Sequence, residues 1–168
     1  MRQKQRWLVF YTRPRSEKKA EDKLQELGYD VLVPKAQEIR QWSDRKKKVI
    51  VPLFPGYLFA LADEDRRISI LETDEIVSNV KFGGKLAELR PQEVENLSII
   101  KQGPQFLEPV KTELPKTGAK VEVQEGPFKG LIGEVEDSRN ETHVLVRIEA
   151  IGQAVRVKLP GSAISVVE

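Results

Sequence analysis

Few residues in this chain could carry out catalysis or bind a metal. The sequence contains one histidine, His143, and no cysteine, which excludes thiolate nucleophiles, disulfides, cysteine-bound zinc and multi-histidine metal sites. The acidic run Asp63–Asp65 is followed directly by Arg66 and Arg67, and acidic residues in this position are typical of a helix N-terminus. We expect His143 at a surface turn. The residue types favour a binding protein over an enzyme, and no cofactor or metal is expected.

Basic residues recur at helical spacing near the N-terminus. Arg15, Lys19 and Lys23 follow one another at intervals of four residues, and Arg13 precedes them. On a helix this spacing forms one basic line. Acidic neighbours such as Glu17 partly neutralise the line, so it is either a solvated face or a surface that contacts phosphate groups. The residues alone leave both interpretations open.

A second candidate for nucleic-acid binding lies in a polar segment further along the chain. Trp42 stands between Arg40 and Arg45, and Lys46–Lys48 follow. Its ring could stack on a nucleic-acid base beside the two guanidinium groups, or it could be a packing residue at the base of a hairpin. Both interpretations fit the residues equally well.

The first part of the chain combines strand-like runs with helix-like segments. Runs of β-branched and aromatic residues predict strands, and apolar residues at helical spacing predict helices. The predicted strands are 7–12, 29–34, 57–61 and 79–82, with a hairpin over 39–51 and helices over 16–28, 63–71 and 91–103. The first helix is expected to start at Ser16, to end at Gly28 and to bury Ala20, Leu24 and Leu27. We therefore expect an α+β domain with a mainly antiparallel sheet and flanking helices.

The second part of the chain changes to a period of two residues. Five short runs, most of them alternating apolar and polar residues, are separated by glycine, proline, asparagine or serine; they cover 121–123, 132–135, 144–148, 155–159 and 164–166. A sheet this small gains most by closing on itself, because closure removes its edges. The pattern predicts a small five-stranded SH3-like β-barrel.

A proline-rich segment separates the two parts. Residues 103–115 include three prolines, which cannot continue a helix or a central strand. Residues 1–110 carry 20 basic and 17 acidic side chains, whereas residues 111–168 carry 8 and 9, so the net charges are +3 and −1. We predict a first domain over 1–103, a linker over 104–115 and a barrel domain over 116–168.

Two stretches of sequence resemble known families. Residues 118–135 resemble the KOW motif, in which Gly126-Pro127 turns the chain, Phe128 fills the barrel, and Gly130 and Gly133 allow backbone geometries that a β-carbon forbids. Residues 7–11 (WLVFY) and 52–59 (PLFPGYLF) resemble the N-terminal domain of NusG-type transcription elongation factors. The order of the two modules also fits that family.

The resemblance to NusG covers residues 6–168, and two segments refine it. Residues 40–47 (RQWSDRKK) and 11–15 (YTRPR) look more like the specialised UpxY-type antiterminators, which are relatives of RfaH, than like housekeeping NusG. The resemblance implies that the first domain binds the clamp helices of the RNA polymerase β′ subunit through an apolar depression. By motif position, the residues lining it would be Tyr11, Phe54, Tyr57 and Phe82.

The same resemblance assigns roles to the basic residues and to the barrel. It brings the non-template DNA strand of the transcription bubble near Arg13, Arg15, Lys19 and Lys23, with Arg40 and Trp42 as further contacts. Ile151 lies between two predicted strands and matches the apolar loop residue through which NusG-type barrels contact ribosomal protein S10 or the termination factor Rho. We expect Ile151 to be exposed; the alternative is that it folds back to cap the barrel.

The resemblance thus implies a transcription elongation or antitermination factor that suppresses pausing or termination. An alternative is a ribosome- or RNA-binding KOW protein, but that class predicts a strongly basic barrel, and residues 111–168 have a net charge of −1. No apolar run approaches the ~20 residues that span a bilayer. A soluble, cytoplasmic monomer without a membrane partner is expected.

Overall fold

The structure is a computed structural model that describes residues 4–110, 118–138 and 141–167. The chain forms two compact units. One comprises Met1–Val33 with Phe54–Val94, and the other comprises Pro34–Leu53 with Glu95–Glu168. Each unit is described by itself below.

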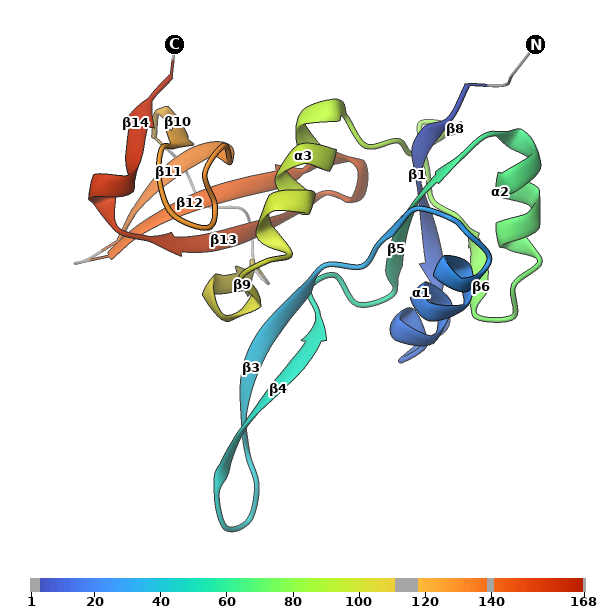
Figure 1. The fold of residues 1–168 in the computed structure, drawn as a ribbon, viewed down its shortest axis with the longest axis horizontal. Coiled ribbons are helices and arrows are strands. Elements are labelled where there is room, and N and C mark those ends of the chain that lie inside the picture. The colour runs from blue at the N-terminus through green and yellow to red at the C-terminus, as the bar shows by residue number, and fades with distance from the viewer. Residues whose placement is uncertain (1–3, 111–117, 139–140, 168) are drawn as a thin grey trace. The chain divides into compact units, whose positions relative to one another are not determined.

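The first unit is built on a four-stranded antiparallel sheet (Figure 1). Its strands lie in the order β2 (Val31–Leu32), β5 (Tyr57–Ala62), β1 (Arg6–Thr12) and β6 (Ile76–Asn79). Val9 and Phe10 at the centre of β1 have no exposed surface, as expected for a run of large apolar residues. The predicted α+β class with a mainly antiparallel sheet is confirmed.

Helices cover one face of this sheet. Ala20 and Leu24 of α1 (Glu17–Glu26) and Ile70 of α2 (Glu64–Leu71) pack with alternate residues of β1 and β5. The α2 helix begins as predicted, because the Asp63 carboxylate accepts a hydrogen bond of 2.9 Å from the backbone N–H of Arg66.

The end of α1 differs from the prediction in one residue. Gly28 has φ +90°, the left-handed conformation predicted for a residue that ends a helix. Leu27, however, is largely exposed rather than part of the core stripe. The reason is that α1 ends at Glu26, so Leu27 leaves the helical face that Ala20 and Leu24 share.

Two smaller elements follow β6. A short hairpin pairs β7 (Lys81–Phe82) with β8 (Lys85–Leu86). The helix α3 (Pro91–Ile100) then starts at the proline predicted for its first position.

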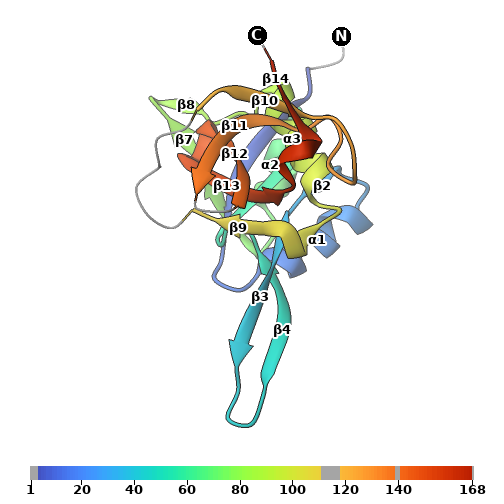
Figure 2. The ribbon, with the colours of Figure 1, turned by 90° about the vertical axis from the view of Figure 1, so that its left-hand side faces the viewer.

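The second unit contains a long two-stranded ribbon. Strands β3 (Lys35–Gln41) and β4 (Lys46–Pro52) pair in one register from Lys35 opposite Pro52 to Gln41 opposite Lys46. The turn is closed by a hydrogen bond of 2.7 Å from the Trp42 N–H to the Arg45 carbonyl. Figure 2 shows the two strands as one twisted ribbon, so the predicted hairpin is confirmed and extends further than expected.

The second unit also contains an antiparallel sheet of six strands. The five predicted runs correspond to β10 (Lys120–Val123), β11 (Ile132–Ser138), β12 (Glu141–Ile148), β13 (Gln153–Leu159) and β14 (Ile164–Val166). The sixth strand, β9 (Leu107–Pro109), pairs with β13 at the far edge of the order β14-β10-β11-β12-β13-β9. Single-turn 3-10 helices occur at Pro104–Phe106, Glu149–Ile151 and Gly161–Ala163.

The predicted linker therefore contributes a strand. Residues 104–109 of the proline-rich segment form the first 3-10 turn and β9, whereas residues 111–117 lie outside the described residues. Proline is compatible with β9 because an edge strand leaves one side of its backbone unpaired.

Two features of the KOW segment match the predictions. Phe128 is buried and packs edge-on against Phe106, with ring centroids 5.8 Å apart. A β-carbon on Gly133 would lie 2.6 Å from the Leu145 carbonyl oxygen, which explains why this position needs glycine.

The prediction for His143 is wrong. His143 is buried in β12, directly opposite Glu136 of β11 and Lys158 of β13, rather than at a surface turn. The alternation of Val144, Val146 and Ile148 indicates a strand that starts at Val144, but β12 begins earlier, at Glu141.

Candidate binding surfaces

One face of the first unit's sheet carries a pair of tyrosines. Tyr11 of β1 and Tyr57 of β5 are directly opposed, and their ring centroids are 5.3 Å apart. Side chains alternate between the two faces of a strand, so Tyr11 and Tyr57 lie on the face opposite to the one that α1 and α2 cover. Tyr11 is 39% exposed and Tyr57 is half-buried. Tyr11 and Tyr57 are thus the two of the four predicted lining residues that the structure brings into contact.

Phe54 does not lie on this surface. The sequence placed it in the lining of the depression, but its side chain is 2% exposed and packs edge-on against Phe59, at a centroid distance of 6.2 Å. The backbone explains this burial: the Tyr57 N–H donates to the Phe54 carbonyl at 3.1 Å, which closes a turn through Gly56, and the turn folds Phe54 inward. Phe54 supports the turn from which Tyr57 projects.

Phe82 is the most exposed of the four predicted aromatic residues, at 78%. It lies in β7, four residues past Ser78, the β6 residue opposite Tyr11. Phe82 therefore forms a second apolar position rather than part of the tyrosine pair. Val77 of β6 is also exposed, and sequence reasoning missed it because the predicted strand starts at residue 79, whereas β6 starts at Ile76.

The predicted basic row is interrupted at its first member. Arg15 precedes α1 and has φ +59°, so it does not share a helical face with Lys19 and Lys23. Arg13 lies before the same turn, and its guanidinium Nε donates a hydrogen bond of 2.6 Å to the Asp74 carbonyl oxygen. All four side chains belong to the first unit and follow β1, but only Lys19 and Lys23 form a helical line.

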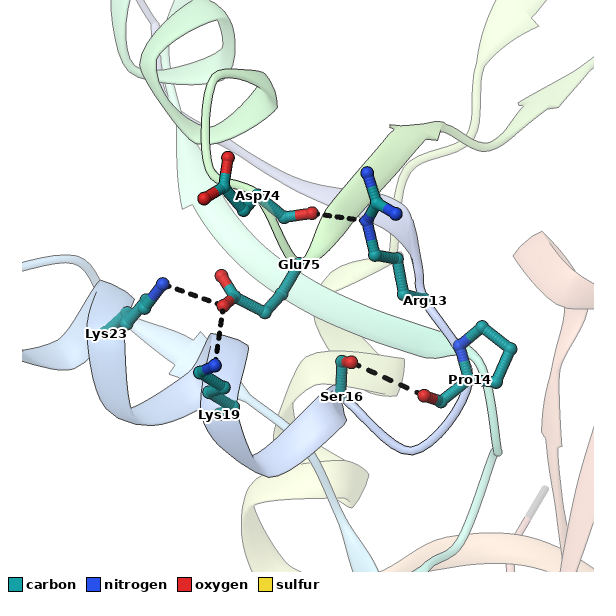
Figure 3. A network of polar contacts seen from close by, with 7 residues as sticks. All are labelled: Arg13, Pro14, Ser16, Lys19, Lys23, Asp74 and Glu75. Atoms are coloured by element: carbon teal, nitrogen blue, oxygen red, sulfur yellow. Dashed lines mark hydrogen bonds and ion pairs between the residues drawn. The ribbon is translucent and has the colours of Figure 1, made fainter.

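Glu75 joins the two lysines of the row (Figure 3). Its Oε1 lies 2.7 Å from the Lys23 Nζ and 3.6 Å from the Lys19 Nζ. The Lys23 ammonium lowers the pKa of the Glu75 carboxyl below its ordinary value, and the same hydrogen bond raises the pKa of Lys23. Sequence reasoning missed Glu75, because it is far from Lys23 in the chain and only the fold brings the two together.

The ribbon of β3 and β4 carries a concentrated positive charge. Residues 35–52 include six basic and two acidic side chains, a net charge of +4, whereas the whole chain has +2. Trp42 is 46% exposed, and the Lys47 Nζ lies 4.6 Å from its ring centroid. Arg40 pairs with Glu38 at 3.5 Å. Of the two interpretations of Trp42, the exposed ring beside cations agrees better with the structure than a packing residue.

Ile151 lies between the two predicted alternatives. It is half-buried at the end of the 3-10 turn Glu149–Ile151, and Gly152 follows with φ +63°. The left-handed glycine turns the chain directly into β13. The side chain is thus neither fully exposed nor part of the barrel core.

Within the described ranges, two kinds of site are absent. No group of three or more histidine, cysteine or acidic residues could hold a metal ion. No helix there is long and apolar enough to cross a membrane.

These features define a class: a protein of two units, with exposed aromatic and basic side chains on an α+β unit and an antiparallel six-stranded sheet in the other. Residues 5–98 match the family described as "Transcription termination factor nusG", which spans more than half of the chain. The chain therefore belongs to the NusG family, whose members are transcription factors and not enzymes.

Individual relatives agree with this family. The transcription termination/antitermination protein NusG of Staphylococcus epidermidis, from two strains, is 25% identical over 177 residues and covers 92% of this chain and 91% of its own length. A solved structure on domain interaction in Thermotoga maritima NusG is 24% identical, covers 98% of both chains and gives a TM-score of 0.52. The fold of the chain is therefore that of NusG.

Proposed function

We propose that this chain is a transcription elongation or antitermination factor that binds RNA polymerase at the clamp helices of the β′ subunit and suppresses pausing or termination. In this proposal a first domain, residues 1–103, binds polymerase and the non-template DNA strand. A linker over 104–115 connects it to a barrel domain, residues 116–168, which recruits a further partner. Family membership and the arrangement of the aromatic side chains support the proposal.

The observation that carries the polymerase contact is the tyrosine pair on the sheet face that α1 and α2 leave uncovered. Aromatic side chains in contact with each other, with part of their surface exposed, are typical anchors of protein interfaces. Tyr11 and Tyr57 would be these anchors, Phe82 a second contact, and Phe54 a buried support of Tyr57.

The DNA contact rests on charge and on one exposed ring. Arg13, Arg15, Lys19 and Lys23 surround the start of α1, and phosphate groups would be their ligands. Trp42, with Arg40 on the neighbouring stretch of the positively charged ribbon, offers a face on which an unpaired base can stack. The polar segment 40–47 is also what favours a specialised factor of the UpxY and RfaH type over housekeeping NusG.

The barrel contact rests on Ile151, which is half-buried at a turn. A net charge of −1 over residues 111–168 suits a protein partner better than RNA, because RNA binding draws on positive charge. Ribosomal protein S10 and Rho are the two candidates. In this proposal the protein acts as a monomer.

A competition experiment tests the polymerase contact. The full chain should be retained by core RNA polymerase, and isolated β′ clamp helices should displace it. The variants Tyr11→Ala and Tyr57→Ala should reduce retention, whereas Ile68→Ala, an exposed apolar residue on α2, serves as the matched control. Retention that the clamp helices do not displace would contradict the proposal, and retention by ribosomes in its place would favour an RNA-binding protein.

A further inference from the structure

Asp74 and Glu75, just before β6, contact three of the basic residues proposed to bind DNA: Arg13, Lys19 and Lys23. Glu75 accepts from Lys23 and lies within ion-pair distance of Lys19, and the Asp74 carbonyl accepts from Arg13. The Arg13 N–H also donates to the Glu75 carbonyl at 2.9 Å. Figure 3 shows the Glu75 carboxylate between Lys19 and Lys23, and the Asp74 carbonyl in contact with Arg13.

Arg15 is the exception among the four. It is exposed, and within the described part of the chain it has no ion pair or hydrogen bond to its side chain. Its left-handed backbone holds it outside the line of α1. The charge of Arg15 is therefore available to a phosphate, whereas Lys19 and Lys23 already share a carboxylate.

The carboxylate of Glu75 is buried, but only one of its two oxygens has a partner among the described residues. Its side chain is 6% exposed, yet the second oxygen, Oε2, is buried without a hydrogen-bond partner among the described residues. A buried anion with one unsatisfied oxygen is costly, and an ion pair alone is weak evidence for a gain in stability. Its partners are the more mobile half of the contact, because the side chains of Lys19 and Lys23 are 70% and 43% exposed.

We propose that Glu75 competes with nucleic-acid phosphate for Lys19 and Lys23, so that these lysines contact DNA only when a phosphate displaces them from the carboxylate. Glu75 is thus a specificity-determining residue: it lowers the affinity of the basic row for any nucleic-acid backbone and leaves a strong contact only where other groups hold the DNA in place. This inference rests on the proposed DNA contact of the row.

Electrostatics sets the size of the effect. The logarithm of the binding constant for single-stranded DNA falls with the logarithm of the salt concentration, by about 0.7 per phosphate contact, because condensed counterions are released. Freeing two lysines from one carboxylate should add about one such contact. At low salt we expect single-stranded DNA to bind about three- to tenfold more tightly.

Glu75→Gln is the direct test, because it removes the charge and keeps the shape and one acceptor oxygen. The probe is a mixed-sequence single-stranded oligonucleotide, titrated into the full chain at several salt concentrations. We expect tighter binding and a steeper salt dependence than in the unaltered chain. Asp22→Asn is the matched control, because it removes one negative charge from the exposed Asp22–Lys18 pair on α1, the helix that carries Lys19 and Lys23. A gain in Glu75→Gln no larger than that in Asp22→Asn would be a net-charge effect and would overturn the inference.

Combining Glu75→Gln with the loss of both lysines tests whether the gain in affinity comes from Lys19 and Lys23. When Lys19→Ala and Lys23→Ala are present, Glu75→Gln should give no further gain; a gain that persists would assign it to other groups and overturn the proposal. In the unaltered chain, the carbon-13 signal of the Glu75 carboxyl should shift when the oligonucleotide binds, a readout that needs no variant to fold. An unmoved signal at saturation would also overturn the inference.

Failure of the proposed DNA contact gives a different pattern. If Arg13→Ala, Arg15→Ala and the two lysine variants all leave binding unchanged while Glu75→Gln has no effect, both the DNA contact and the role of Glu75 are wrong. If the basic variants weaken binding and Glu75→Gln does not tighten it, only the role of Glu75 is wrong.

Discussion

The rings of Tyr11 and Tyr57 meet across two antiparallel strands at 5.3 Å, inclined by 41°. Each ring therefore covers part of the other, and the position of one depends on the presence of its neighbour. A residue that approaches this face would contact both rings at once. The pair is best treated as one binding feature rather than two.

The first prediction follows from this mutual contact. Tyr11→Ala and Tyr57→Ala should each weaken clamp-helix binding by about 1 to 3 kcal/mol, the range of interface hot spots. The double variant should lose less than the sum of the two, because each single variant already removes the support of the other ring. Isothermal titration with isolated clamp helices measures all three. A fully additive double variant would show that the two rings act independently.

The second prediction compares Phe54 with Phe82. Substitution by alanine should lower the free energy of unfolding strongly at Phe54 and hardly at all at Phe82. Phe54→Ala leaves a cavity beside Phe59 and should lower the free energy of unfolding by about 3 to 5 kcal/mol. Phe82→Ala removes an exposed ring and should change that free energy by less than about 0.5 kcal/mol. Urea unfolding of both variants measures the difference. Equal stability of the two would contradict the burial of Phe54.

The strands and the turn at Gly56 could be predicted from sequence because their signals are local. Three elements combine β-branched or aromatic residues with flanking turn residues: β1, β5 and the hairpin of β3 and β4. The sequence predicts all three, and the structure contains them. The KOW motif also has a local signal, because its glycines are set by the backbone: in the structure, Gly133 has no room for a β-carbon.

The errors arose where a neighbour distant in the sequence, or the exact end of an element, decides the outcome. Leu27 lies outside the core because α1 ends at Glu26, one residue before it, and Arg15 lies outside the basic row because α1 starts at Glu17, two residues after it. Glu75 could not have been found, since its lysines lie on another element. The same limit applies to Phe54, whose burial depends on the turn and on Phe59.

The third prediction concerns acid stability of the barrel. Arg156 donates to both carboxylate oxygens of Glu136, at 2.9 and 3.0 Å, and this contact lowers the pKa of Glu136. Because the folded pKa lies below the unfolded value of about 4.3, the stabilisation is fully present above that value and is lost as the pH falls through the folded pKa. Glu136→Gln should therefore cost about 1 to 2 kcal/mol at neutral pH and progressively less in acid.

Urea unfolding at a series of pH values tests this dependence. Glu134→Gln is the matched control, because Glu134 pairs with Arg147 on the same sheet but both side chains are more exposed. Its cost should be smaller at every pH. A Glu136→Gln cost that does not diminish in acid would mean that the ion pair is not its source.

The fourth prediction concerns the ribbon of β3 and β4. Trp42→Ala should weaken binding of a single-stranded oligonucleotide by about 1 to 3 kcal/mol, the range for stacking of one base. Ile39→Ala is the control, because Ile39 is an apolar residue of the same ribbon that is more exposed than Trp42 and has no aromatic ring to stack. Fluorescence anisotropy measures both, and equal losses would assign the effect to the ribbon as a whole rather than to the ring.

The last prediction concerns Ile151 and the partner of the barrel. Ile151→Glu places a charge on a half-buried side chain at the turn before β13, so we expect a modest fall in melting temperature together with loss of binding to ribosomal protein S10 or Rho. Val166→Glu is the matched control, because it introduces the same charge on an exposed valine of β14 in the same barrel and should leave both properties nearly unchanged. The full chain is used, with titration of each partner and thermal unfolding measured side by side. A collapsed melting temperature for Ile151→Glu would show that this side chain caps the barrel, and unchanged partner binding in a folded variant would move the contact elsewhere.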